Sequence, residues 1–292
     1  MGQPQLSGHP VKGISLLSFS YLLERLAYYG FRAILILYLV NRLGFEKSEA
    51  ADWYGTFTGA ICVSVFIGAL LGDFLIGAPA AIIAGGILET IGFFCVAIPG
   101  KGTALSGLVF IVLGSGLLKP NLVAQVTSIY KSRVRYMDAG FSIFYFAVNL
   151  GACLGPLIIG MTDDGNSAHF SVGFCIAGLV SLISIVPVIL DYKNFKINFA
   201  ISREYKVSNS PSSIISLICI LLLQPVFWSI YEAIDGMAYE ANHGNYFHGI
   251  LMPLIFLIIL SGPVSVVLWS LVKMESIYKI SLGFLFLAIP LV

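Results

Sequence analysis

A glutamate and an arginine stand next to each other inside a mostly apolar stretch. Glu24 and Arg25 lie in the run Tyr-Leu-Leu-Glu-Arg-Leu-Ala-Tyr-Tyr-Gly-Phe-Arg, which covers residues 21–32. A charge at membrane depth costs from about 3 to above 10 kcal/mol, so a chain keeps one there where the charge has a partner or a function. At about 100° per residue, six polar and aromatic side chains share about 140° of one helix face: Tyr21, Glu24, Arg25, Tyr28, Tyr29 and Arg32. We expect this helix to line a polar cavity between helices.

Other ionisable residues also lie inside apolar segments, namely Arg32, Glu89, Lys119 and Glu232. Ion pairs among such residues would relieve the cost of their burial, and these pairs could serve helix packing alone. For Glu24, Arg25, Lys119 and Glu232 we favour a functional role, because each stands among aromatic, glycine or asparagine residues. For Glu89 a structural ion pair and a functional role are equally open.

Apolar helices must position these residues, and the composition supplies them. Hydrophobic residues form 58% of the 292 residues, charged residues form 11%, and the mean hydropathy is +0.93. Soluble domains are about 25% charged, and a membrane-spanning helix needs about 20 apolar residues. Eight segments meet that need: 14–43, 53–75, 78–98, 105–129, 139–161, 170–190, 214–237 and 250–272. We therefore predict an all-α polytopic membrane protein.

The longest internal loop divides the predicted helices into two groups. We expect residues 1–190 to form an N-terminal six-helix bundle, 191–213 to form a cytoplasmic linker, and 214–292 to begin a C-terminal bundle. A ninth apolar stretch begins near Ile280 and is too short at Val292 to span a membrane. The second bundle would then be incomplete, with two full helices and part of a third. We prefer a fragment of a longer protein over a re-entrant or lost last helix.

Loop charges predict the orientation of the chain. With a cytoplasmic N-terminus, ten Lys and Arg residues fall in inner loops and three fall in outer loops, as the positive-inside rule requires. The polar start of the chain, up to Lys12, lacks the apolar core of a cleaved signal peptide. We expect an integral multi-pass protein of the plasma or inner membrane.

Other classes of function find little support. The net charge of +1 offers no basis for nucleic-acid binding, and the five cysteines lie in apolar segments, where packing roles are typical. Glu240, His243 and His248 could suggest a metal site, but a solvated outer loop explains them better. No catalytic combination of residues is apparent. We therefore expect neither an enzyme nor a cofactor.

Four motifs, in order along the chain, resemble those of the proton-dependent oligopeptide transporter family of the major facilitator superfamily. The first, Glu-Arg-Leu-Ala-Tyr-Tyr-Gly at 24–30, resembles the end of the family's Glu-x-x-Glu-Arg-Phe-x-Tyr-Tyr-Gly. The others are Gly-Ser-Gly-Leu-Leu-Lys-Pro-Asn at 114–121, Phe-Tyr-Phe-Ala-Val-Asn-Leu-Gly at 144–151 and Pro-Val-Phe-Trp-Ser-Ile-Tyr-Glu at 225–232. Together they extend the resemblance from about residue 14 to residue 272.

The resemblance implies a major facilitator fold and symport of di- and tripeptides by alternating access. It implies no cofactor, with protons as the coupling ion, and it implies a small peptide or zwitterionic solute and the lipid bilayer as partners. Positions that match the proton-coupling residues of the family are Glu24, Arg25, Lys119 and Glu232. Positions that match its substrate-binding residues are Tyr28, Tyr29, Arg32, Lys119, Asn149, Trp228 and Glu232.

One departure from the family bears on proton coupling. Tyr21 stands where the family motif has its first glutamate, and tyrosine ordinarily titrates only near about pH 10. We therefore predict weaker pH dependence than is typical, with Glu232 as the main titrating group and Glu89 as the next candidate. Two alternatives stay open: a transporter or sensor for another small anionic or zwitterionic solute without proton coupling, and a non-functional fragment.

Overall fold

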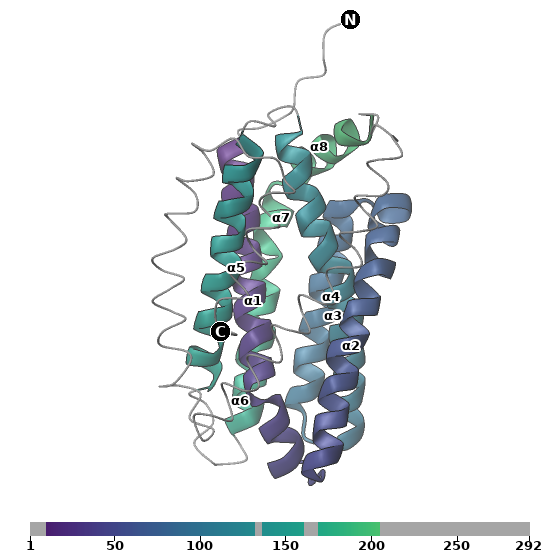
Figure 1. Ribbon diagram of the computed structural model, residues 1–292, viewed down its shortest axis with the longest axis vertical. Coiled ribbons are helices and arrows are strands. Elements are labelled where there is room, and N and C mark those ends of the chain that lie inside the picture. Colours follow the sequence, from purple (N-terminus) through teal and green to yellow (C-terminus); the bar gives the residue numbers. More distant parts are fainter. Residues whose placement is uncertain (1–9, 132–135, 161–168, 205–292) are drawn as a thin grey trace, which may run out of the picture. The chain divides into compact units, whose positions relative to one another are not determined.

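The computed structural model describes residues 10–131, 136–160 and 169–204. The chain divides into two units, Met1–Glu204 and Tyr205–Val292, and all described residues belong to the first unit. Within them the chain forms α1 (Pro10–Asn41), α2 (Lys47–Leu71), the π-helical turn η1 (Gly72–Ile76), α3 (Ala78–Ala97), α4 (Lys101–Tyr130), α5 (Met137–Gly160), α6 (His169–Ser184), α7 (Val186–Leu190) and α8 (Tyr192–Glu204) (Figure 1).

These helices match the first six segments predicted from the sequence. Five helical stretches of the described part are long and apolar enough to cross a membrane: Lys47–Ile76, Ala78–Ala97, Lys101–Tyr130, Met137–Gly160 and Phe170–Leu190. The sixth, α1, has comparable length and carries the charged residues Glu24, Arg25 and Arg32. The all-α, multi-pass membrane architecture is therefore confirmed. The described residues do not test the remaining predictions, which are the segments 214–237 and 250–272, the stretch from Ile280 and the division of the chain after residue 190.

The sixth predicted segment is broken in one place. It ends as α6 at Ser184 and resumes as the short α7, which contains Pro187 in its first turn. Proline has no backbone N–H, so it ends one run of helical hydrogen bonds and is well tolerated at the start of another. The hydroxyl groups at the break are satisfied locally, since Ser184 Oγ donates to the carbonyl of Ser181 at 2.6 Å.

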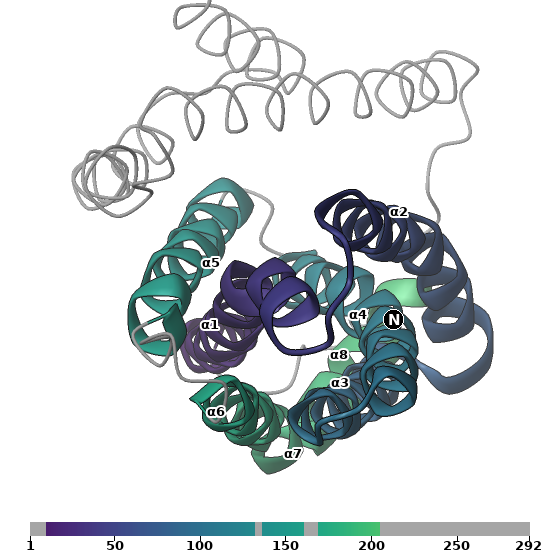
Figure 2. The same ribbon diagram turned by 90° about the horizontal axis from the view of Figure 1, so that it is seen from below.

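The helices of the described part form a bundle in which each main helix has its largest contacts with one or two others. Seen from below, α1 lies between α5 and α6, and α4 lies between α2 and α3 (Figure 2). The most extensive contacts join α3 to α4 and α1 to α5, and α3 also packs against α6. Membrane helices approach this closely where glycine leaves room. A Cβ atom on Gly155 of α5 would lie 2.4 Å from the carbonyl oxygen of Leu26 on α1.

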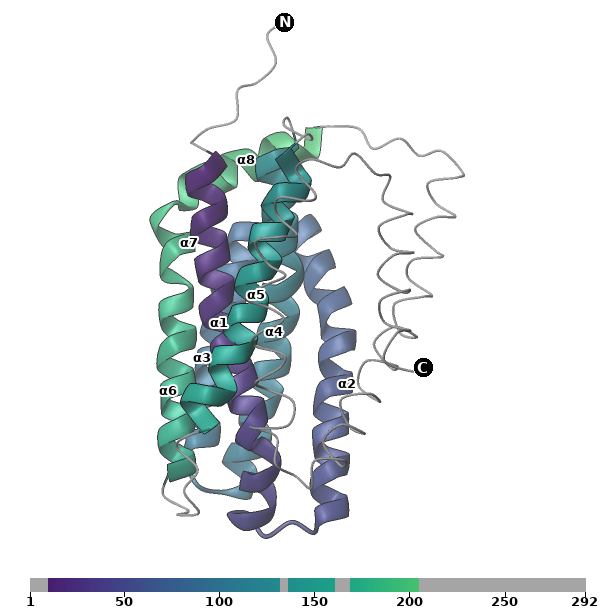
Figure 3. The ribbon, with the colours of Figure 1, turned by 60° about the vertical axis from the view of Figure 1, so that its left-hand side comes forward.

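The last helix of the described part, α8, lies across the end of the bundle where α1 begins (Figure 3). Its Phe195 and Phe199 are buried, and the carbonyl of Phe195 accepts a hydrogen bond of 3.1 Å from Gln125 of α4. Lys12 near the start of α1 forms an ion pair of 2.9 Å with Asp191, at the junction of α7 and α8. The sequence predicted a loop at this point, and the structure has a helix there.

Two apolar clusters fill the bundle, and a polar layer separates them along three helices. On α1 one cluster ends at Tyr21 and the other begins at Leu26. On α3 the clusters are represented by Ile82 and Phe93, and on α4 by Leu118 and Ile111. The buried polar residues within or beside these limits, together with two serines of α6, form what we call the polar layer: Ser20, Glu24, Arg25, Glu89, Thr90, Ser115, Ser181 and Ser184.

Candidate functional site

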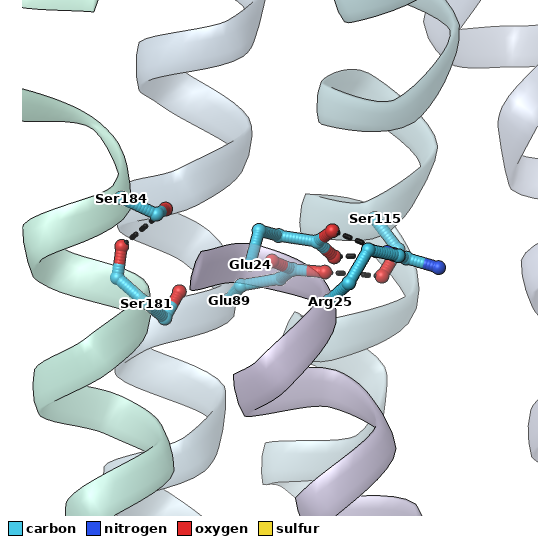
Figure 4. Close-up of polar contacts among 6 residues, drawn as sticks. All are labelled: Glu24, Arg25, Glu89, Ser115, Ser181 and Ser184. Atoms are coloured by element: carbon cyan, nitrogen blue, oxygen red, sulfur yellow. Dashed lines mark hydrogen bonds and ion pairs between the residues drawn. The ribbon is translucent and has the colours of Figure 1, made fainter. Parts of the chain in front are cut away.

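Side-chain contacts of the polar layer join α1 to α6, α3 to α6 and α3 to α4, and Figure 4 draws the ion pair of α1 and the contact between α3 and α4. Ser20 of α1 donates to the carbonyl of Ser184 at 2.6 Å, and Thr90 of α3 donates to Ser181 Oγ at 3.3 Å. The hydroxyl of Ser115 on α4 donates to Glu89 Oε1 on α3. Polar contacts of this kind join helices where water is excluded.

The central feature of the layer is the ion pair between Glu24 and Arg25. Arg25 Nε donates to Glu24 Oε2 at 2.5 Å, and Nη2 donates to Oε1, so the contact is bidentate. Glu24 is only 1% exposed and Arg25 only 5% exposed. Because both partners lie on the same helix, the pair needs no other helix for its neutralisation.

Three tyrosines of α1 surround the guanidinium group of Arg25. Its Cζ atom lies 4.9 Å from the ring centroid of Tyr21, 4.8 Å from that of Tyr28 and 5.5 Å from that of Tyr29. Arginine placed over aromatic rings gains about 0.5–2 kcal/mol for each such contact, most where water is absent. The helical spacing on α1 thus supplies a carboxylate and several rings to a single cation.

Tyr21 also connects α1 to α5. Its ring stacks on Phe144, with the centroids 4.9 Å apart and the planes 27° from parallel. It is 9% exposed and belongs to the apolar cluster on the side of α8. The residue that stands in place of the family's first glutamate is therefore part of the helix packing.

Lys119 reaches the site from α4. Its ammonium nitrogen lies 4.0 Å from the ring centroid of Tyr28, and the side chain is half-buried. Tyr28 consequently has a cation over its ring from two helices, Arg25 on its own and Lys119 on the neighbouring one. Pro120 follows Lys119 inside α4, which leaves one helical hydrogen bond of α4 unformed.

Arg32 lies two turns beyond Arg25 on α1 and contacts α2. Its Nε donates to the hydroxyl oxygen of Tyr54 on α2, and its Cζ lies 5.2 Å from the centroid of that ring. Tyr54 was not predicted as a site residue, since no motif or spacing in the sequence links a residue near the start of α2 to α1. Arg32 and Lys119 are both half-buried.

The remaining residues selected from the sequence fall outside this set of contacts or outside the described residues. Asn149 is exposed on α5, and its amide donates to the carbonyl of Tyr145 at 3.0 Å within the same helix. Trp228 and Glu232 lie beyond the described residues, as do Glu240, His243 and His248. In residues 10–131, 136–160 and 169–204, no group of three His, Cys, Asp or Glu side chains could hold a metal ion.

Comparison with known proteins relates this bundle to transporters. The model of the POT family matches residues 80–198. The transporter YclF of Bacillus subtilis (strain 168) is 32% identical over 266 residues, which cover 87% of this chain and 52% of that protein. A di-/tripeptide transporter of Lactococcus lactis subsp. lactis is 33% identical over 181 residues, which cover 59% of this chain and 36% of that protein.

Solved structures give the same result. The crystal structure of the peptide transporter POT in complex with sulfate has a TM-score of 0.62 and 30% identity, covering 89% of this chain and 54% of that one. A POT family transporter in complex with 5-aminolevulinic acid has a TM-score of 0.61 and 27% identity, covering 90% and 53%. The chain belongs to the POT family. This is a family of transporters, not of enzymes. The match to YclF covers most of this chain, and the chain spans about half the length of YclF.

Proposed function

We propose that the protein is a secondary active transporter that carries di- and tripeptides together with protons by alternating access. One observation carries the proposal: a buried Glu24–Arg25 pair and the cation of Lys119 meet around the ring of Tyr28 inside a bundle of apolar helices. Ionisable groups inside a membrane protein are retained for substrate or ion pathways. The relative from Lactococcus lactis named a di-/tripeptide transporter supports peptides as the cargo.

The chemistry of a zwitterionic peptide fits the proposed binding residues. Arg32 and Lys119 offer two half-buried cations for its carboxylate, and charge-assisted hydrogen bonds to a carboxylate are the stronger kind. Glu232 is proposed to hold the amino group. The proposed walls and polar contacts are Tyr28, Tyr29, Trp228 and Asn149, because aromatic faces tolerate varied side chains.

For proton coupling we propose Glu24, Arg25, Lys119 and Glu232. A carboxylate that exchanges one cationic partner for another during the cycle gains or loses a proton as its surroundings change. The protein would lie in the plasma or inner membrane with its N-terminus in the cytoplasm, in line with the loop charges. Protons are the only coupling species in this proposal.

Uptake into proteoliposomes tests the proposed function. The full-length protein is reconstituted, and accumulation of radiolabelled dialanine is followed with and without an inward proton gradient. We expect accumulation above the external concentration with the gradient, and competition by unlabelled dipeptides and tripeptides but not by free alanine. Dialanine uptake that equals that of protein-free vesicles would refute peptide transport.

The position of Tyr21 favours one second candidate, transport or sensing of a small anionic or zwitterionic solute without proton coupling. Tyr21 is buried and stacked on Phe144, and it offers no acid where the family motif has one. The same vesicles separate the two candidates. Uptake that the gradient leaves unchanged would favour the second one.

A further inference from the structure

We propose that Glu89 of α3 carries a proton during transport and so provides on α3 the acid that Tyr21 does not provide on α1. The proposal rests on the proposed function and adds a residue to its coupling machinery. Glu89 belongs to none of the four motifs that resemble the family. It is 0% exposed and lies in the polar layer opposite the ion pair of α1 (Figure 4).

The hydrogen bonds of Glu89 satisfy only half of its carboxyl group. Oε1 accepts from Ser115 Oγ, whereas Oε2 has no hydrogen-bond partner among the described residues. A buried carboxylate with one oxygen unpaired is costly, and a bound proton removes the charge that causes the cost. Oε2 is the free position for that proton.

The packing of α3 against α4 holds Glu89 in place. A Cβ atom on Gly114 of α4 would lie 2.6 Å from the backbone nitrogen of Glu89 and 2.8 Å from its Cγ. The side chain therefore crosses α4 where that helix has only a hydrogen atom, and it runs towards Ser115. This close approach keeps the carboxyl group in the interior, away from the lipid.

The charged groups that act on Glu89 come from two helices. Glu24 and Arg25 face it from α1, and Lys119 faces it from α4. From α6 the nearest polar group of the layer is Ser181, which contacts the neighbouring Thr90. Arg25 is already bound to Glu24 by two hydrogen bonds. Of the two described cations that act on Glu89, Lys119 is therefore the one left to neutralise it.

In this conformation Lys119 lies over the ring of Tyr28 and, within the described part of the chain, not within ion-pair distance of Glu89. It is nevertheless placed to reach it. Lys119 follows Ser115 by four residues on α4, so the two side chains share one face of the helix, and Ser115 already touches Glu89. Movement of the Lys119 ammonium group from the ring of Tyr28 to Glu89 gives the carboxylate a partner.

The proposed step is therefore a proton exchange tied to this movement. With Lys119 over Tyr28, the proton is bound to Glu89 Oε2. When the ammonium group of Lys119 approaches, the O–H bond breaks, the proton passes to a water molecule, and the carboxylate pairs with Lys119. The return of Lys119 to Tyr28 allows Glu89 to take up a new proton.

The test compares two modes of transport by the full-length protein in proteoliposomes. Counterflow exchanges labelled for unlabelled dialanine without a gradient, and driven accumulation requires the inward proton gradient. We expect Glu89→Gln to retain counterflow while internal dialanine no longer exceeds the external concentration. The matched control is Glu49→Gln, which makes the same change at an exposed residue in the first turn of α2 and should alter neither mode.

Each of the following outcomes would overturn the inference or the proposed function on which it rests. Accumulation by Glu89→Gln equal to that of the unaltered protein would overturn it. If Glu89→Gln fails to fold, Glu89→Asp takes its place, because it keeps the acid on a shorter side chain. A pH profile of accumulation equal to that of the unaltered protein would also overturn the inference. If the unaltered protein shows neither mode, the proposed function fails, and infrared difference spectra between acidic and alkaline buffer still report on Glu89. If the spectra of the unaltered protein contain no protonated carboxyl band that disappears in Glu89→Gln, proton binding by Glu89 is refuted.

Discussion

The ammonium nitrogen of Lys119 lies 4.0 Å from the centroid of the Tyr28 ring, so a cation of α4 rests on an aromatic face of α1. The same ring has the guanidinium group of Arg25 at 4.8 Å. Tyr28 thus lies between a cation that is neutralised by Glu24 and a cation that has no carboxylate within ion-pair distance among the described residues. The predictions below depend on this difference between the two cations.

Lys119 should be required for driven uptake. Lys119→Ala removes the cation proposed to bind the peptide carboxylate and to pair with Glu89, so we expect loss of gradient-driven dialanine uptake. The control is Lys101→Ala, which removes an exposed cation from the first turn of the same helix, where it lies over Phe45. Normal uptake by Lys119→Ala would exclude Lys119 from the mechanism.

The ring of Tyr28, more than its hydroxyl group, should matter for substrate affinity. Tyr28→Phe keeps the aromatic face and should transport with a nearly unchanged KM. Tyr28→Leu removes the aromatic face proposed to line the peptide site, an expected loss of about 1.4 kcal/mol of binding free energy, which predicts a rise in KM of roughly tenfold. Initial rates at graded dialanine concentrations measure both variants, and equal KM values for Phe and Leu would contradict the prediction.

An acid restored on α1 should strengthen proton coupling. Tyr21→Glu introduces a carboxyl group close to Arg25, whose guanidinium group lies over the Tyr21 ring. We expect a larger ratio of uptake with the gradient to uptake without it. Tyr21→Phe is the control, because it keeps the stacking on Phe144 and adds no acid. The prediction fails if both variants show the same ratio.

Breaking the buried ion pair should cost more stability than removing it. Glu24→Gln leaves Arg25 charged and buried, with an expected loss of about 3–5 kcal/mol, whereas the double variant Glu24→Gln with Arg25→Gln leaves no net charge behind. Thermal unfolding in detergent should give the lower Tm for the single variant. A lower Tm for the double variant would show that contacts of Arg25 with the tyrosines outweigh the uncompensated charge.

Two glycines should respond in opposite ways to the same substitution. Glycine in a helix interior is less stable than alanine by about 0.5–1 kcal/mol, and Gly59 has no neighbour within 4 Å of an added Cβ atom. Gly59→Ala should therefore raise Tm slightly. Gly114→Ala should lower it, because its Cβ atom would meet the carbonyl oxygen of Gly85 at 2.6 Å as well as Glu89. Equal Tm changes would contradict the close α3–α4 contact.

The extent of the helices could be predicted because apolar length alone determines it. The first six predicted segments differ from the observed helices by only a few residues at most ends. The break between α6 and α7 has a local cause in Pro187, so the position of the break is predictable from that residue. The helix α8 was missed because its residues are polar on average, and its Phe195 and Phe199 show a buried face only once the bundle end is known.

The candidate site was predicted in part. Helical spacing placed Glu24, Arg25 and the tyrosines on one face, and the observed contacts of Arg25 follow from that spacing. The contact of Ser115 with Glu89 and that of Arg32 with Tyr54 depend on how two helices are aligned along each other. For Ser115 and Glu89 that alignment includes the close contact of Gly114 on α4 with Gly85 and Glu89 on α3, which no motif within a single helix encodes.

The self-contained ion pair of α1 also bears on how the protein enters the membrane during synthesis. Translation delivers α1 before its main packing partner α5, which begins only at Met137. When α1 has just been synthesised, none of the helices that follow it is yet present to neutralise Glu24 or Arg25, and each charge alone would oppose insertion. Because the two residues bind each other on one helix, their neutralisation is available as soon as that turn has formed. The order of synthesis thus gives the neighbouring positions of Glu24 and Arg25 a role in biogenesis, before any cargo is bound.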